Sequence, residues 1–279
     1  MFPAGQGGMA WLQYDYQDQN RNWSGTSTAP AANNGDKEIE TDFVTAGFQY
    51  MFNSSWGVQF EVPYDYRKFT TVTANPNAPN PGVTTATVNW GALGDIRLEG
   101  IYTGFFPDQS AGVTFGLKLP TGDWTYNNAW GDVDRDSEIG TGSTDILLGG
   151  FYRGNITKDE KWDWFAQGLL DVPVLTQVGY RPGVELDSAA GIDYKGFSLG
   201  RMRISPVAQV IFSERASDSG SNANPDNSGY QRILLSPGIE FHIHPVKIYA
   251  DVELPVYQNF TGNQLAAPVL FKVSASYMF

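Results

Sequence analysis

Apolar and polar residues alternate along most of this chain, in about twelve segments of strand length. Between Trp56 and Arg67, large apolar side chains occupy every second position, and polar side chains such as Gln59 and Glu61 fill the positions between them. Successive side chains of a β-strand point to opposite faces of its sheet, so each segment predicts a strand with one apolar and one polar face. No helical spacing of apolar residues is sustained for a convincing length.

The stretch from Val113 to Trp124 shows what kind of sheet these strands form. Val113, Phe115, Leu117 and Leu119 share one face, whereas Lys118 and Pro120 lie on the other. A central strand of a soluble sheet rarely tolerates a proline, because proline cannot donate to the hydrogen-bond ladder. A membrane barrel instead turns its apolar row toward lipid and its polar row toward the lumen. The proline then lies where the strand leaves the membrane.

The connections between the predicted strands alternate in length. They are short after the even-numbered strands and long after most odd-numbered strands, over about 18–38, 68–90, 121–142 and 213–229. Short turns on one rim and long loops on the other are typical of outer-membrane barrels. An even number of strands places both termini on the rim with short turns.

Aromatic residues cluster at the ends of the predicted strands, as expected for two interfacial girdles. In a soluble β-sandwich, the alternative fold, core aromatics favour the middles of strands. Near the short turns lie Phe52, Trp56, Phe105, Phe106, Trp162, Trp164, Tyr194, Phe197, Tyr277 and Phe279; near the other rim lie Tyr14, Tyr16, Tyr64, Tyr66, Tyr180, Phe212, Tyr230 and Tyr257.

The sequence therefore predicts an all-β protein, a transmembrane antiparallel up-and-down β-barrel of about twelve strands, with short periplasmic turns and long extracellular loops. We expect residues 1–279 to form a single barrel domain in the bacterial outer membrane. In the second strand, over about 39–51, we assign Ile39, Phe43 and Thr45 to the outer face and Glu40 and Asp42 to the inner face.

Composition narrows the possible partners. The net charge is -12, only 17% of the residues are charged, and no basic patch suggests nucleic acid. There is no cysteine, which excludes disulfides and thiolate chemistry. No apolar run is long enough for a membrane-spanning helix. The first residues lack the basic and apolar regions of a signal peptide, so an exported chain would have lost its signal.

A short pattern of charged residue, aliphatic residue and proline recurs on four odd strands. It is found at 61–63, 118–120, 171–173 and 253–255. One interpretation is structural, because a proline ends ladder pairing or marks a bulge where the barrel opens. The other is functional, a ring of charge below the mouth of the barrel. The two are compatible, and we favour the structural role.

Three glycine-containing motifs resemble a known family. Gly94-Asp95 begins the fourth strand, 116–123 (GLKLPTGD) ends the fifth, and 140–145 (GTGSTD) opens the sixth. They are similar to those of the outer-membrane proteins called "MetA-pathway of phenol degradation", a family of proposed transporters. The last strand resembles those of bacterial outer-membrane proteins, in which a final Phe, here Phe279, serves the assembly machinery. The resemblance implies an outer-membrane barrel that passes small aromatic or apolar compounds.

Catalysis has little support in the sequence, and we predict that the protein is not an enzyme. The only histidines, His242 and His244, share the predicted inner face, and no Gly-x-Ser-x-Gly elbow occurs. We expect no cofactor. The acidic run 132–138 offers a weak metal site at Asp132, Asp134 and Asp136, but it departs from the EF-hand pattern at Ser137 and Ser143. A solvated acidic loop is the favoured interpretation.

The inner row of charges leads to a hypothesis about function. We predict a porin-like channel for passive passage of small solutes, whose acidic lumen disfavours anions. The alternative is a closed structural or adhesive barrel whose extracellular loops bind a partner. A variant is uptake of apolar compounds through a side opening. We expect a monomer in contact with membrane lipid and lipopolysaccharide. The residues predicted to line the pore are Glu61, Asp65, Arg67, Asp95, Arg97, Glu99, Lys118, Asp171, Glu185, Asp187, Arg201, Arg203, Arg232, Glu240, Asp251 and Glu253.

Overall fold

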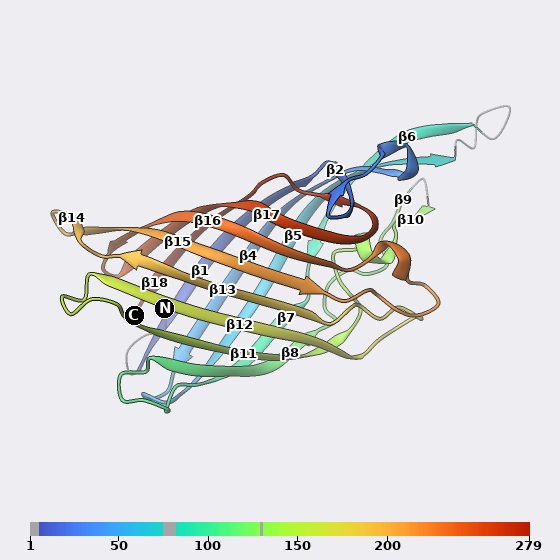
Figure 1. The fold of residues 1–279 in the computed structure, drawn as a ribbon. Coiled ribbons are helices and arrows are strands. Elements are labelled where there is room, and N and C mark those ends of the chain that lie inside the picture. Colours follow the sequence, from blue (N-terminus) through green and yellow to red (C-terminus); the bar gives the residue numbers. More distant parts are fainter. Residues whose placement is uncertain (1–5, 75–81, 129–130) are drawn as a thin grey trace.

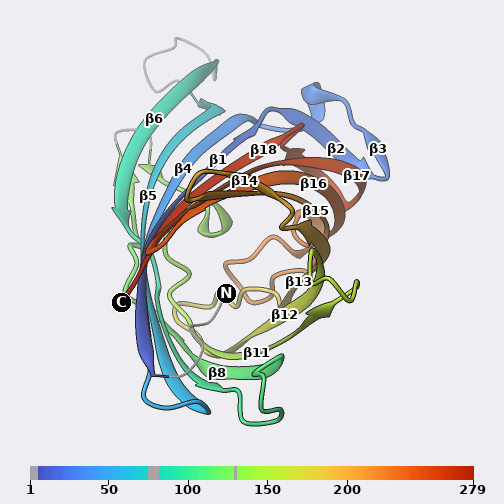
Figure 2. The ribbon, with the colours of Figure 1, turned by 90° about the vertical axis from the view of Figure 1, so that its left-hand side faces the viewer.

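The computed structural model is a closed antiparallel β-barrel of twelve wall strands (Figure 1). It describes residues 6–74, 82–128 and 131–279. The last wall strand pairs with the first, which closes the ring seen in Figure 2. The wall strands are β1 (Gly7–Gln19), β4 (Asp36–Met51), β5 (Trp56–Ala74), β7 (Ile96–Tyr102), β8 (Ala111–Leu119), β11 (Thr144–Asn155), β12 (Trp162–Leu175), β13 (Glu185–Tyr194), β15 (Met202–Arg215), β16 (Tyr230–Ile243), β17 (Val246–Ala266) and β18 (Leu270–Met278).

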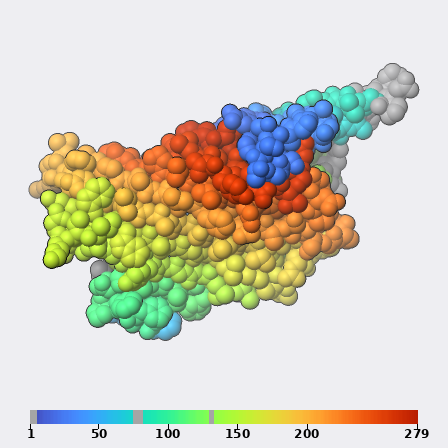
Figure 3. Space-filling model, viewed as in Figure 1, coloured from blue at the N-terminus to red at the C-terminus, as the bar shows by residue number. Residues whose placement is uncertain are grey.

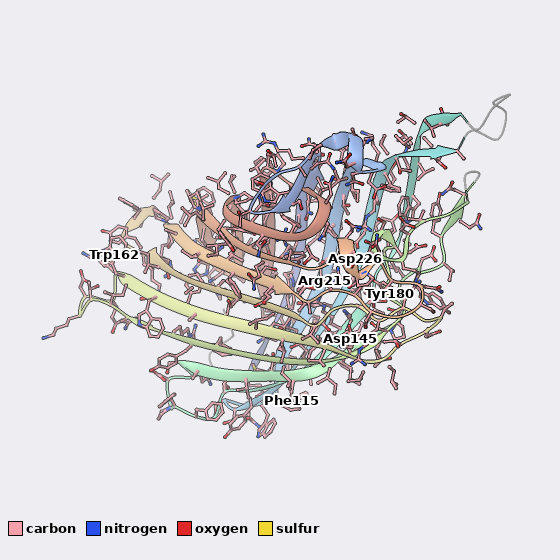
Figure 4. All side chains as sticks on the ribbon, turned by 45° about the vertical axis from the view of Figure 1, so that its right-hand side comes forward. Phe115, Asp145, Trp162, Tyr180, Arg215 and Asp226 are labelled. Atoms are coloured by element: carbon pink, nitrogen blue, oxygen red, sulfur yellow. The ribbon has the colours of Figure 1, made fainter. Side chains whose placement is uncertain are left out.

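The apolar rows face outward, as the alternation predicts. On β8, Val113, Phe115 and Leu117 are exposed, and the side chain of Lys118 is buried behind the wall. In Figure 4, Phe115 projects from the outer surface of the barrel. A sheet that exposes such rows on its outside can be solvated only by lipid over that band. The barrel is therefore of the transmembrane type, and the sequence prediction of the fold is confirmed.

The predicted facing of the second strand is wrong. In the ladder with β1, Tyr14 pairs with Val44 and Tyr16 with Asp42, and paired residues share a face. Tyr14 is exposed on the outside and donates a hydrogen bond to Asp42. Glu40, Asp42 and Val44 therefore face outward, whereas Ile39, Phe43 and Thr45 face inward. Charged residues near the outer rim misled the sequence interpretation, because they lie above the apolar band rather than inside the lumen.

The two rims differ as predicted. Both termini and the short turns lie at one end of the barrel, and the longer connections lie at the other (Figure 1). Exposed aromatics near the short turns include Trp56, Phe105 and Trp162. At the loop end, Tyr64 is exposed in the same way. Tyr180 and Tyr230 are exceptions: Tyr180 is buried under the loops, and the Tyr230 hydroxyl donates to Glu185.

The predicted loop over 68–90 is largely strand. β5 continues to Ala74, and β6 (Val83–Leu93) pairs with it from Tyr64↔Leu93 to Ala74↔Val83. The hairpin formed by β5 and β6 rises from the loop end of the barrel (Figure 3). Threonines dominate this segment, and they favour strands because their branched side chains fit a pleated sheet. Their polarity suggested a loop, but their shape favours a strand.

Each recurring proline lies at an irregularity of the ladder. Pro63 accepts a backbone hydrogen bond from Gly94, where the fourth strand breaks into β6 and β7. Pro120 follows the last residue of β8. The register shifts opposite Pro173 in β12 and beside Pro255 in β17. These positions support the structural interpretation of the motif.

The remaining elements are short. They are β2 (Arg21–Gly25), β3 (Ser27–Thr28), β9 (Asn127–Asn128), β10 (Gly131–Asp132), β14 (Phe197–Leu199) and the 3-10 turns η1 (Ala31–Asn33), η2 (Arg135–Ser137) and η3 (Pro225–Asn227). Within the part of the chain that the structure describes, no helix is long and apolar enough to cross a membrane.

Candidate functional site

The lumen contains two cavities that meet in the middle of the barrel. One, of about 890 Å³, lies toward the short-turn end, and the other, of about 500 Å³, lies toward the loop end. Both are lined by Trp11, Glu61, Arg97, Glu253 and Lys272, so they adjoin at the level of these residues, which we call the neck. Cavities of these sizes are in the range that holds small molecules.

We call residues 120–128 and 131–143, which follow β8, the inner loop; its residues near 122 and over 133–141 lie against the inner face of the wall. Both oxygens of the Asp95 carboxylate hold it. Gly122 N donates to Asp95 Oδ1 at 2.9 Å, and Thr141 donates to Oδ2 through its backbone N at 2.8 Å and through Oγ1 at 2.6 Å. One carboxylate thus fixes the two ends of the loop. Hydrogen bonds to a charged acceptor are about twice as strong as neutral ones.

A second set of contacts holds the middle of the inner loop. Arg67 Nη1 donates to the carbonyl of Ser137 at 2.5 Å and to that of Glu138 at 3.2 Å. Val133 and Ile139 pack with Phe69 and Trp90 in the one cluster of buried apolar residues found within the described part of the chain. The inner loop is therefore anchored by apolar burial as well as by hydrogen bonds.

The three motifs behind the family resemblance meet at this anchor. A Cβ on Gly140 would lie 2.5 Å from the backbone of Gly122, and one on Gly122 would lie 2.9 Å from the backbone of Gly94. Such distances exclude any side chain, so three backbones approach as only glycines permit. Asp95 and Thr141 follow two of these glycines. The motifs are thus a packing and capping device for the inner loop.

Lysines in the lumen are balanced by carboxylates. Lys118 Nζ lies 2.5 Å from Asp145 and 2.8 Å from Asp171, and Asp145 is fully buried. Lys272 lies 2.8 Å from Glu253 and 3.8 Å from Asp15. These groups connect neighbouring strands of the wall, in keeping with the bracing role that paired charges take in a barrel lumen.

Two further ion pairs lie near the short-turn end. Lys247 lies 3.3 Å from Glu240, and Lys195 forms an ion pair with Asp163. The His242 Nδ1 contacts Arg203 Nη2 at 2.7 Å. The residue that contacts the His242 ring is thus an arginine and not a nucleophile such as serine. This contact is compatible with a structural role for His242.

The predicted pore-lining residues fall into three groups. Arg201 is exposed in the turn before β15 and lines neither cavity. Four face inward but are occupied by wall or loop contacts, namely Arg67, Asp171, Arg203 and Asp251. The others line at least one cavity: Glu61, Asp65, Asp95, Arg97, Glu99, Lys118, Glu185, Asp187, Arg232, Glu240 and Glu253.

The acidic run of the inner loop is only partly solvated. Asp134 and Asp136 are exposed, but Glu138 is 7% exposed. Burial raises the pKa of Glu138 to about 7. The side chain of Asp132 lies outside the described residues, and no group of three acidic or histidine side chains suited to a metal occurs among those that are described.

Sequence reasoning missed the cluster that joins the other extracellular connections. Asp218 is buried and accepts hydrogen bonds from Tyr180 Oη, Gly183 N and Arg215 Nη2. Figure 4 places Tyr180 and Arg215 side by side at the loop end. Arg135 of the inner loop lies 4.9 Å from the Tyr180 ring centroid. The contributing residues come from three different connections, so no local sequence pattern predicts the cluster.

Comparisons with solved structures support the fold. No protein-family model and no curated sequence matches the chain. The COG4313 outer membrane channel from Pseudomonas putida F1 superposes with a TM-score of 0.68, covering 100% of this chain and 97% of that chain at 10% identity. The beta domain of the Bordetella autotransporter BrkA gives 0.57, covering 98% and 100% at 13% identity. At such low identities the likeness shows a shared outer-membrane barrel fold.

Proposed function

We propose that this protein is a bacterial outer-membrane channel for passive passage of small solutes, small aromatic and apolar compounds among them. The observation that carries the proposal is the pair of adjoining cavities inside a closed transmembrane barrel. The similarity in fold to an outer membrane channel is in keeping with it. The inner loop would restrict the pathway at the outer end, because it borders the cavity toward the loop end at Ile139 and Thr141. We call this cavity of about 500 Å³ the upper cavity.

Charge in the upper cavity supports selection against anions. Its lining includes three basic side chains, Arg97, Lys118 and Lys272. Carboxylates outnumber them, so an anion would meet net repulsion along the narrow part of the path. The acidic residues of this lining are Asp15, Glu61, Asp65, Asp95, Glu185 and Glu253.

Single-channel recording and liposome swelling test the channel. The purified protein in planar bilayers is expected to show discrete conductance steps with cation preference, and proteoliposomes are expected to swell in small neutral solutes. Absence of both conductance and solute flux would refute the proposal. An anion preference would refute the selectivity while leaving the channel intact.

We further propose that the protein belongs to the family that its sequence motifs resemble, and that it has the membrane partners expected from the sequence. The convergence of Gly94, Gly122 and Gly140 on one anchor supports membership in the MetA-pathway family, because their motifs then serve one shared structure. The exposed position of Phe279 at the short-turn end is in keeping with recognition of the last strand by the assembly machinery. A single, monomeric barrel domain in contact with lipopolysaccharide completes the proposal, and light scattering of the detergent complex tests the monomer.

Two observations favour other routes or roles. The fourth strand is broken at Gly94 and Asp95, and β8 ends at Leu119 beside this break, so an apolar solute could leave sideways there. Detergent density in that wall gap would support the side route.

The hairpin of β5 and β6 rises beyond the barrel, which suits the adhesive alternative. A lumen found impermeable to water and ions would favour that alternative.

A further inference from the structure

The upper cavity contains one carboxylate that has no partner. Asp65 is 6% exposed, lines this cavity, and has a buried Oδ1 with no hydrogen-bond partner. None of the hydrogen bonds or ion pairs found among the described residues involves either of its oxygens. Burying a carboxylate without a partner costs free energy of folding. Such a group beside a cavity is therefore a candidate for binding a ligand.

The neighbouring charges do not satisfy Asp65. Arg67, two residues along β5, directs its Nε to Thr41 and its Nη1 to the inner loop. Lys118 is held by Asp145 and Asp171, and Lys272 by Glu253 and Asp15. Each of these cations already has its own partners on the wall or the loop, and Arg97, the third cation of this cavity, interacts electrostatically with Glu61 and Asp187.

Asp95 differs from Asp65 in its hydrogen bonding. It lines the same cavity and interacts electrostatically with Asp65, but its two oxygens accept three hydrogen bonds from the inner loop. The pair therefore brings two negative charges together, and its donors are all on one side. Arg67 interacts electrostatically with Asp65, but no ion pair with Asp65 occurs among the described residues, so a cation in the cavity would supply the missing partner.

An aromatic wall lies in the same cavity. Trp11 borders both cavities at the neck, and its indole covers the backbone of Gly47 so closely that a Cβ there would lie 2.0 Å from the ring. Phe43 lines the upper cavity further along β4 and lies directly opposite Asp65 in the ladder, so these two side chains share one face of the wall. Aromatic faces attract organic cations through the ring quadrupole.

We propose that Asp65 and Phe43, which face each other across β5 and β4 in the upper cavity, form a subsite for a small organic ammonium ion with an apolar body. The carboxylate would accept a charge-assisted contact from the ammonium group, and the aromatic wall would pack against the rest of the solute. This inference rests on the proposed channel function and names the class of solute that its upper cavity selects.

Calorimetry with the full chain in detergent tests the subsite, with phenyltrimethylammonium, benzyl alcohol and benzoate as probes. The cation is expected to bind more tightly than the neutral alcohol and the acid. Asp65→Asn is expected to weaken cation binding about tenfold and to leave benzyl alcohol unaffected, because only the charge is removed. Asp65→Glu should retain most of the binding. Asp226→Asn, a matched change at an exposed turn, should match the wild type.

Heat-modifiable migration on gels establishes that each variant forms a barrel. Equal binding of the cation by Asp65→Asn and wild type would overturn the inference, as would benzoate binding that equals cation binding or no binding of the cation at all. Bilayer conductance separates the two proposals. If the protein conducts but does not bind the cation, the subsite is refuted and the channel stands. If it binds the cation but does not conduct, the channel is refuted and the subsite stands.

Discussion

The two ends of the barrel are held together in different ways. At the short-turn end, each wall strand pairs with both neighbours, from β1 round to β18. At the loop end, the wall is interrupted between β5 and β8, because the fourth strand breaks at Gly94 and β8 stops at Leu119. There, the inner loop and a few buried charges replace the missing ladder.

This difference indicates where side chains matter most. A backbone ladder tolerates side-chain changes, since its hydrogen bonds come from the main chain. A wall held by side-chain charges does not, because each buried charge needs its partner. We therefore expect polar substitutions at the loop end to have larger effects than similar ones at the short-turn end.

Lys118→Met is the strongest test of that expectation. It leaves Asp145 and Asp171 buried without their cation, and breaking such a buried pair costs about 3–5 kcal/mol of unfolding free energy. Urea unfolding in detergent micelles measures the loss. Lys195→Met at the short-turn end is the control, because Lys195 and Asp163 are more exposed and have water as a substitute. Equal losses for the two variants would contradict the contrast between the ends.

Asp95→Asn tests the inner loop directly. Asn keeps one acceptor oxygen, but its amide group would face the two donors of Thr141, so about 2–4 kcal/mol of loop anchoring is lost. The expected result is a larger and noisier single-channel conductance as the loop leaves the lumen. Asp42→Asn, on the outer face near the rim, should leave the conductance unchanged. A quiet channel of normal conductance in Asp95→Asn would show that the loop is held by other contacts.

Gly140→Ala addresses the backbone contact at the same anchor. The new Cβ would lie within 2.5–2.8 Å of Gly122 backbone atoms, and overpacking of this kind costs about 1–3 kcal/mol. Unfolding in urea should show the loss, together with a modest rise in conductance. Gly168→Ala, in the regular wall, has no atom closer than 3.6 Å to the added carbon and should be close to neutral. A neutral Gly140→Ala would mean that the loop can shift away without loss.

Sequence patterns predict the regular end of the barrel better than the broken end. Alternation alone gives the strands and the outward rows such as Val113, Phe115 and Leu117, because lipid imposes a period of two on the wall. The facing of β4 fails at Glu40 and Asp42, where the strand passes above the apolar band and either face can be polar. Periodicity carries information only where one face is forced to be apolar.

The site is less predictable because it depends on contacts between distant segments. The sequence identifies Asp95 and Lys118 as inner residues, but not that one anchors a loop and the other joins three strands. Nothing local distinguishes Asp65, which lacks a partner, from Asp95, which has three donors. The glycine motifs were the available signal, since glycines that permit close backbone approach mark a point where segments meet.

The pH response of the inner loop is the smallest effect we expect at the broken end. Burial raises the pKa of Glu138 from its usual 4.5 to about 7, so the folded loop holds this proton more tightly than an extended chain does. The stabilisation from this group is complete below pH 4.5 and is lost as the pH rises through about 7. Conductance should therefore rise by about two- to threefold between pH 5.5 and 8, as the charged carboxylate loosens the loop.

Glu138→Gln removes the titrating group and should flatten the profile, whereas Glu214→Gln, on β15 in the regular wall, should leave the profile as in the wild type. A pH dependence that survives in Glu138→Gln would assign the response to another group and leave the loop indifferent to pH.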